Sequence, residues 1–305
     1  CMLTIPLVGY EDSLVGVLQI LNKIDGVFDE QDEYVGQALA AQAAVVLHRA
    51  KITEQIIASE RLDREISVAR DVQMGTLPKN MPIIEGYEFG GAFAPTDQTG
   101  GDLYDFVPLA DQKLFLLMGD ASGHGIGPAL SATQVRAMLR VALRLESSLD
   151  DAFMHINDQL CDDLPDDRFV TAFFGLLDGK THAIRFHSGG QGPIMHYQAE
   201  MGEYEWHPAT TFPLGYMPHS SLDPPKKALL DPGDVFGLIS DGIYEYENEA
   251  GVQFGHRGVR KILDKNPDAS AQELVDKIMA AAREHGGTAP QADDITIVLV
   301  RRLPE

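Results

Sequence analysis

After Pro82 the sequence is a succession of short apolar runs of strand length. Helical patterns interrupt them only at 127–145, 149–160 and 270–284, so strands and helices do not alternate regularly. Regular alternation is the pattern of a doubly wound parallel sheet. The sequence therefore predicts antiparallel sheets with helices on their outer faces. The runs are YEFGGAFA, LYDFVPL, KLFLLMGD, FVTAFFGLLD, AIRFHSG, PIMHYQ, DVFGLISD and ITIVLVRR.

A long stretch without proline precedes these runs. Residues 34–77 contain only Gly36 and Gly75 as helix-weakening residues. This predicts one helix, or two nearly continuous ones, of about 60 Å at 1.5 Å per residue. Pro78 and Pro82 end the helical pattern, and we place a domain boundary there.

A heptad reading of this stretch mixes polar and apolar residues along the seam. One seam position takes Val45, Ile52, Ser59 and Ile66, and the other takes Arg49, Ile56, Asp63 and Arg70. Such a seam predicts only a weak coiled coil. A solvated linker helix is one interpretation. Our hypothesis is the other, a signalling helix that forms a homodimer through residues 35–75 and can change register.

The charge balance excludes several classes of partner. Lys and Arg number 24 against 46 Asp and Glu, for a net charge of −22. With no dense basic patch, we expect no nucleic-acid binding and no attraction to an anionic membrane. No apolar run approaches about 18 residues and no signal peptide opens the chain, so we expect no membrane insertion and a cytoplasmic location. Cys1 and Cys161 cannot form a disulfide framework.

Four acidic sites share one pattern, an apolar run bounded by an Asp that usually has Gly beside it. They are residues 100–105, 117–125, 238–242 and 293–297. Each Asp lies at the edge of a predicted strand, so a sheet could present all of them at one rim. Aligned carboxylates repel one another unless a cation lies between them, and Mg²⁺ and Mn²⁺ prefer oxygen ligands.

Each site alone has a simpler explanation. Asp-Gly is a common turn, and an acidic residue at a strand end is often only a solvated edge. Four such sites after four apolar runs favour a metal site, although spacing alone leaves the turn explanation open. The glycine-rich residues 189–193 lack the Lys-Ser/Thr of a nucleotide-binding loop and indicate a tight turn.

Taken in order, GDLYDF, GDASGHG, LISDG and DDITIVLV resemble the metal-dependent protein serine/threonine phosphatases of the protein phosphatase 2C superfamily. Within it they resemble the bacterial SpoIIE and RsbU branch. The segment ISVARDVQMGTLP (66–78) is similar to the helix-to-proline element that opens those catalytic domains. The resemblance covers about residues 60–303. It implies an α+β fold, an α–β–β–α sandwich of two antiparallel sheets flanked by helices.

The resemblance also implies the site residues. The four catalytic aspartates and one backbone carbonyl would be the ligands of two Mn²⁺ or Mg²⁺ ions: Asp102, Asp120, Asp241, Asp293 and the carbonyl of Ala121. Asp294 stands where other members often have Asn, so we interpret it as supporting rather than ligating. His124 follows Asp120 at a greater distance than the catalytic histidine of eukaryotic members does, so it cannot simply inherit their general-acid role.

The implied reaction is hydrolysis of phosphoserine or phosphothreonine by a metal-bridged hydroxide, because two metals lower the pKa of a shared water. No cysteine nucleophile is needed, and Cys161 lies on the apolar face of a predicted helix. The ten histidines are scattered and show no HExxH pattern, which disfavours zinc hydrolase chemistry.

The front segment, residues 5–47, resembles the last strands and terminal helix of a GAF sensory domain. Residues 2–28 read as a hairpin, and because the chain opens on Cys1 we expect it to join a domain already under way. A GAF domain, a helix and this phosphatase form a signalling architecture. Its implied substrate is a phosphorylated STAS-type antagonist of a bacterial anti-sigma factor.

We therefore predict three parts. The C-terminal part of a GAF-like domain spans 1–50, a helical linker for dimerisation and switching spans 51–80, and the phosphatase domain spans 81–305. Rotation of the helix would position Asp102 and Asp120 relative to the metals. The alternative is a catalytically weak phosphatase-fold scaffold that binds a signalling partner. A metal phosphodiesterase acting on nucleotides is a further alternative, without a base-binding pattern to support it.

Overall fold

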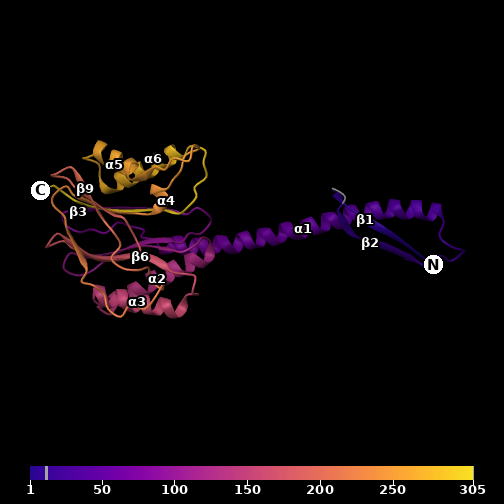
Figure 1. The fold of residues 1–305 in the computed structure, drawn as a ribbon, viewed down its shortest axis with the longest axis horizontal. Helices are drawn as coiled ribbons and strands as arrows, with labels where there is room; N and C mark the ends of the chain where they lie inside the picture. Colours follow the sequence, from indigo (N-terminus) through magenta and orange to yellow (C-terminus); the bar gives the residue numbers. More distant parts are fainter. Residues whose placement is uncertain (11–12, 305) are drawn as a thin grey trace. The chain divides into compact units, whose positions relative to one another are not determined.

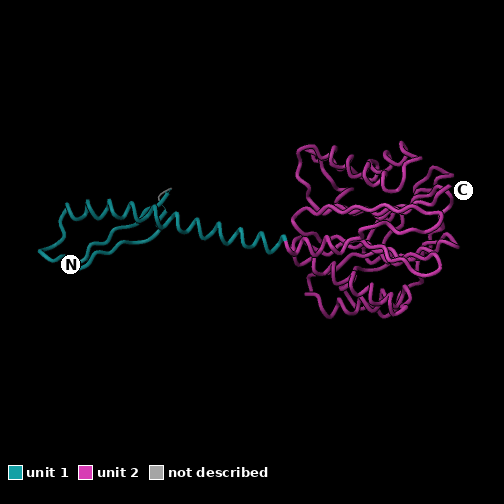
Figure 2. Tube along the Cα trace, turned by 180° about the vertical axis from the view of Figure 1, so that it is seen from behind, with its two compact units in different colours: residues 1–67 teal, residues 68–305 magenta. Residues whose placement is uncertain are grey.

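The computed structural model describes residues 1–10 and 13–304, and it divides into two compact units, residues 1–67 and 68–305 (Figure 2). Residues 11 and 12, inside the hairpin predicted over 2–28, lie outside the described part of the chain. Among the described residues, no helix combines the length and the apolar character needed to cross a membrane.

The first unit is a hairpin and most of one long helix. Strands β1 (Met2–Val8) and β2 (Leu14–Leu21) pair antiparallel, and α1 (Glu30–Thr76) follows them as a single uninterrupted helix of about 70 Å. Asp29 begins the helix, because its carboxylate accepts the N–H groups of Gln31 and Asp32. A small core joins the hairpin to the helix through Ile5, Leu7, Ala40 and Ala44.

The second unit is a sandwich of two five-stranded sheets in which neighbouring named strands pair antiparallel. One sheet has the order β10-β7-β6-β5-β4, and the other β3-β12-β11-β8-β9. The first sheet consists of β4 (Asp102–Pro108), β5 (Lys113–Ala121), β6 (Val170–Asp178), β7 (Ala183–Gly189) and β10 (Lys226–Leu229). The second consists of β3 (Tyr87–Ala94), β8 (Ile194–Gln198), β9 (Glu203–His207), β11 (Val235–Ile239) and β12 (Ile295–Arg302).

Helices cover the outer faces of both sheets (Figure 1). The first sheet is covered by α2 (Ile126–Arg144) and α3 (Leu149–Asp163), and the second by α5 (Gly255–Lys265) and α6 (Ala271–Gly286), with the short α4 (Asp241–Tyr244) after β11. Phe173, Phe186 and Phe236 belong to the apolar layer between the sheets. The predicted α–β–β–α sandwich is confirmed.

Sequence patterns did not indicate β9, β10, α4 and α5. Strands β9 and β10 are short and lie at sheet edges, where half of each strand is solvated and the apolar alternation is weak. Helix α5 contains Gly255 and Gly258, and it buries only Val259 and Leu263 among its eleven residues. Packing against the sheet therefore outweighs the weak helix propensity of this segment.

Candidate active site

The register of β4 against β5 brings the first two predicted ligands together. Asp102 opens β4 and lies directly opposite Asp120 near the end of β5. Asp102 is buried and Asp120 is half-buried. Asp105 faces the other way, where Arg136 and Arg140 of α2 bind its carboxylate at 2.9 and 2.6 Å. The second Asp of the GDLYDF motif thus anchors a helix.

The second sheet supplies the other acidic residues. Asp241 begins α4 immediately after β11, and Asp293 and Asp294 immediately precede β12, which pairs with β11. The Thr296 hydroxyl of β12 donates to the Asp102 carboxylate at 2.5 Å, which joins the two sheets at this end. We call the five carboxylates gathered here the carboxylate rim: Asp102, Asp120, Asp241, Asp293 and Asp294.

Asp294 is turned toward the backbone of the segment that leads into β4. Its carboxylate accepts the N–H groups of Thr96 at 2.8 Å and Asp102 at 3.3 Å. A side chain at Gly100 would not fit, because its Cβ would lie 2.1 Å from an Asp294 oxygen. These contacts agree with a supporting role for Asp294.

The Ala121 carbonyl, the predicted backbone ligand, also lies against a glycine. A Cβ at Gly101 would lie 2.5 Å from this oxygen, so a larger residue there would displace it. Ala121 N–H donates to the Gly101 carbonyl at 3.1 Å. The paired glycines before Asp102 are therefore required by close packing at the rim.

The rim carboxylates raise one another's pKa. Burial, followed by the charge of Asp120, raises the pKa of Asp102 well above its ordinary value. Burial, followed by the charges of Asp241, Asp293 and Asp294, raises the pKa of Asp120 to about 7. The pKa of Asp241 is raised by burial and by Asp293. Burial and mutual repulsion both disfavour the charged carboxylates, and a bound cation would offset both effects.

A cavity of about 330 Å³ opens beside the rim. Asp120, Asp293 and Asp294 line it together with His124, and no Lys or Arg is among its lining residues. His124 is exposed, and its Nδ1 lies 3.3 Å from the Asp97 carboxylate. The buried Thr99 hydroxyl, also in the wall, has no hydrogen-bond partner among the described residues. A wall rich in carboxylate and hydroxyl oxygens, one hydroxyl of which is unpaired, fits a hydrated hard cation.

A larger cavity of about 970 Å³ lies apart from the rim. Trp206 and basic side chains of α5, among them Arg257 and Arg260, line it, and no rim carboxylate does. By size alone this cavity would be the candidate active site, but the titratable side chains converge at the 330 Å³ cavity beside the rim. We therefore place the candidate active site at the carboxylate rim.

Two residues beside the rim were not singled out from the sequence. Gln73, in the last turns of α1, is buried; its amide donates to the Gly100 carbonyl at 2.6 Å and accepts from the Gly100 N–H at 3.2 Å. Thr296 holds Asp102 from the opposite sheet. Both residues lie inside segments that carry the family resemblance. The sequence around each of them, however, does not indicate that Gln73 contacts Gly100 or that Thr296 contacts Asp102.

Three comparisons bear on this geometry. Residues 110–303 match the family model described as Stage II sporulation protein E (SpoIIE). Protein IcfG of Synechocystis is 26% identical over an alignment of 267 residues that covers 78% of this chain and 41% of that protein. The phosphoserine phosphatase RsbU of Bacillus subtilis is 24% identical over 246 residues, or 80% of this chain and 71% of RsbU. The SiaA-PP2C domain of Pseudomonas aeruginosa has a TM-score of 0.66 at 23% identity and covers 80% of this chain and 98% of that one.

The sandwich has the fold of protein phosphatase domains of the 2C type. The family match extends over more than half of the sequence, so the chain belongs to the SpoIIE family. The chain spans only about two fifths of the length of IcfG. The resemblance of residues 1–50 to a GAF domain stays a prediction.

Proposed function

We propose that this chain is a metal-dependent phosphatase that hydrolyses phosphoserine or phosphothreonine on a protein. The observation that carries the proposal is the convergence of Asp102 and Asp120 from one sheet with Asp241 and Asp293 from the other. Family membership supports it, and so does the similarity to RsbU, a phosphoserine phosphatase.

The rim residues would hold two Mn²⁺ or Mg²⁺ ions through the side chains of Asp102, Asp120, Asp241 and Asp293 and the carbonyl of Ala121. Oxygen donors with raised pKa values and no neighbouring Lys or Arg fit hard dications. When bound, such ions supply an activated water and neutralise the charge of a phosphoryl group.

The remaining residues keep this arrangement in place. Thr296 directs one oxygen of Asp102, and Asp294 holds the Thr96 and Asp102 backbone in position. Asp241 and Asp293 are exposed, which leaves the rim accessible to a phosphoryl group on the surface of another protein. Fixed ligands and open access together suit a phosphoprotein substrate.

For the substrate we propose a phosphorylated STAS-type antagonist of an anti-sigma factor, encountered in the cytoplasm. This follows from the resemblance to the SpoIIE and RsbU branch. The chain's net charge of −22 is no obstacle to a local interaction at the rim, because bound dications would offset the acidic charge there.

For regulation we propose a homodimer through residues 35–75 of α1. Beyond the hairpin the helix leaves apolar side chains exposed, among them Val45, Ile52, Ile56 and Leu62. At its other end Gln73 holds the Gly100 backbone, two residues before Asp102. A change in helix packing would thus reach the rim through a defined pair of hydrogen bonds.

The test of the proposed activity is turnover of a phosphoserine-bearing STAS protein, followed by intact-mass spectrometry. We expect loss of the phosphoryl mass in Mn²⁺ or Mg²⁺ and none in EDTA. Equal turnover in EDTA would contradict the metal requirement. Failure of calorimetry to detect Mn²⁺ binding, together with absent turnover, would favour a scaffold that only binds a partner.

A further inference from the structure

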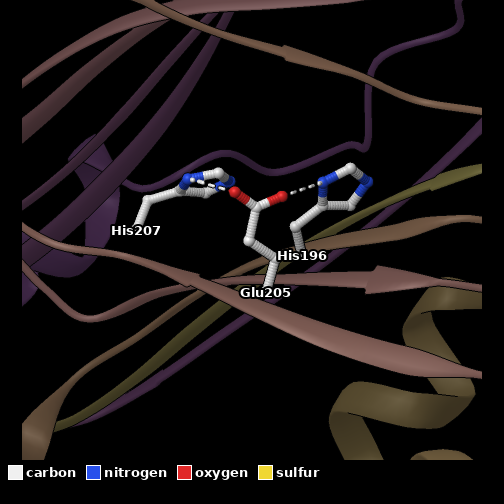
Figure 3. A group of neighbouring side chains, drawn as sticks. All are labelled: His196, Glu205 and His207. Carbon is white, nitrogen blue, oxygen red and sulfur yellow. Dashed lines mark ion pairs between the residues drawn. The ribbon is translucent and has the colours of Figure 1, made fainter.

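A second polar cluster lies on the hairpin of β8 and β9, at the edge of its sheet. The register places His196 opposite Glu205, and His207 follows two residues later on the same face of β9. We call these three residues the β8–β9 triad. Figure 3 shows the Glu205 carboxylate between the two imidazole rings. The ligand atoms of the triad all lie within 4.8 Å of one another.

The buried carboxylate of Asp234 orients the ring of His196 from the side opposite Glu205. Its Nε2 lies 3.0 Å from Asp234, whose carboxylate also accepts the N–H groups of Ala199 at 2.8 Å and Asp231 at 2.9 Å. Because Asp234 acts as an acceptor in each contact, His196 Nε2 carries the proton. This tautomer, assigned from the hydrogen-bond network, leaves the lone pair of Nδ1 facing Glu205.

Each ring of the triad has a buried nitrogen without a hydrogen-bond partner among the described residues, and burial lowers the pKa of His207, with a smaller contribution from the charge of Lys226. His196 is 3% exposed, and its Nδ1 lies 4.0 Å from the carboxylate with no hydrogen-bond partner among the described residues. His207 Nδ1 lies 3.5 Å from the same carboxylate, and the buried Nε2 is equally without a partner. A ring lone pair facing a carboxylate is repulsive, and a cation between them would remove the repulsion.

We propose that His196, Glu205 and His207 bind one transition-metal dication of the Zn²⁺ type. Two imidazoles and a carboxylate are ligands of borderline softness, which suit Zn²⁺, Ni²⁺ or Co²⁺ better than Mg²⁺ or Mn²⁺. The site is separate from the carboxylate rim and independent of the proposed phosphatase activity.

The spacing of the triad suits such an ion. Imidazole nitrogens and carboxylate oxygens lie about 2.0–2.1 Å from Zn²⁺, so tetrahedral neighbours are about 3.3 Å apart. The contacts of 3.5 and 4.0 Å need only small side-chain rotations to reach this. Asp234 supplies the outer carboxylate that usually orients a ligating histidine. Glu205 is 53% exposed at its side chain, which provides an entry path and an open fourth position for water.

The bound ion would fasten the edge strand. Glu205 and His207 lie on β9, His196 on the neighbouring β8, and Asp234 immediately before β11. Trp206, between the two β9 ligands, lines the 970 Å³ cavity beside α5. The ion would therefore stabilise the strand that forms one wall of this cavity.

The test uses Co²⁺ as a spectroscopic probe on the full chain, freed of metal by chelation and then supplied with excess Mg²⁺ to occupy the rim. We expect intense visible d–d bands of four-coordinate Co²⁺, saturating at one ion per chain and abolished by Zn²⁺. Six-coordinate oxygen sites give only weak bands, so the rim does not contribute to this signal.

Two variants and a matched control decide the assignment. Glu205→Gln and His207→Ala should weaken Co²⁺ binding at least about 100-fold, since loss of a mere supporting partner costs 10–100-fold. His155→Ala, at an exposed histidine of α3, should bind as the wild type does. If His207→Ala does not fold by circular dichroism, Glu205→Gln decides alone because that side chain is partly exposed. Absence of the bands in the wild type, or unchanged bands in Glu205→Gln, would overturn the proposal.

Discussion

The carboxylate rim and the β8–β9 triad are both convergent ligand sets, but they are built differently. The rim draws hard oxygen ligands from two sheets, and burial, followed by repulsion among the carboxylates, raises the pKa of Asp102 and Asp120. The triad draws two ring nitrogens and one carboxylate from a single hairpin. In the described part of the chain, only the triad brings three such ligand atoms within 4.8 Å.

The two sites therefore differ in how the fold prepares them for a metal. At the rim, the carboxylates repel one another until cations bind between them, which suits exchangeable ions that take part in chemistry. At the triad, the ring of His196 is already held by Asp234, so little rearrangement accompanies binding. We therefore expect the rim to bind hard ions that take part in turnover. We expect the triad to bind an ion of borderline softness that stabilises the edge strand.

The largest effect should come from removing a rim ligand. Asp120→Asn or Asp241→Asn should lower kcat/KM on a phosphoserine protein by more than about 100-fold, because supporting partners of metal ligands alone account for 10–100-fold. Asp166→Asn, at an exposed aspartate, is the matched control. The Co²⁺ bands of the triad should persist in both rim variants. Full activity of Asp120→Asn would remove the rim from the mechanism.

Replacing a residue that supports a metal ligand should lower metal affinity by an intermediate factor. Each such substitution should affect only its own site. Thr296→Val keeps the side-chain shape but loses the hydrogen bond to Asp102, so Mn²⁺ affinity should fall by roughly 10–100-fold. Asp234→Asn should weaken Co²⁺ binding at the triad by a similar factor. Calorimetry with each metal on each variant measures both. A loss at the opposite site would show that the clusters are coupled.

Protonation should compete with metal at the rim. The raised pKa of Asp120, about 7, means that Mn²⁺ must displace a proton below this pH, so affinity should fall roughly tenfold per pH unit. In the metal-free protein Asp120 keeps its proton in the native state and loses it in the unfolded state between about pH 4 and 7. The contribution of this carboxyl group to the free energy of unfolding should therefore decrease as pH rises through that window. Thermal melts in EDTA at several pH values check the sign, and a flat profile would contradict it.

The smallest effect should come from the distant helix. Ser59→Leu with Asp63→Leu should tighten an α1 dimer and change turnover in one direction, by a few-fold, while leaving the triad bands unchanged. Both positions are exposed. Analytical ultracentrifugation and turnover measure the two effects.

A double variant tests how this signal reaches the rim. If the helix acts through Gln73, the Leu substitutions should have no effect on turnover in a Gln73→Ala background, whereas Gln55→Ala, at an exposed position of α1, should leave the response intact. If the protein is a monomer at high concentration and the Leu substitutions leave turnover unchanged, α1 only connects the two units and does not regulate the rim.

The sequence by itself determined antiparallel sheets with outer helices and an acidic rim at the strand ends, because strand periodicity and Asp at strand ends are local properties of the chain. The sandwich and the individual ligands followed from the family resemblance of the motifs. The two aspartates of GDLYDF have different surroundings in the structure. Because side chains alternate along β4, Asp102 faces the rim, whereas Asp105 faces α2 and binds Arg136 and Arg140. The position of each Asp within the motif did not reveal this, because the partner arginines lie on a later helix.

Only the tertiary structure decided the contacts that complete both sites. Thr296 and Asp102 are 194 residues apart, and Gln73 and Gly100 are 27 apart, so their meeting depends on how the sheets stack and where α1 ends. His196, Glu205 and His207 looked like scattered residues because a shift of one residue in the β8–β9 register would place His196 and Glu205 on opposite faces. Register is set by the packing of the whole sheet, and no single segment encodes it.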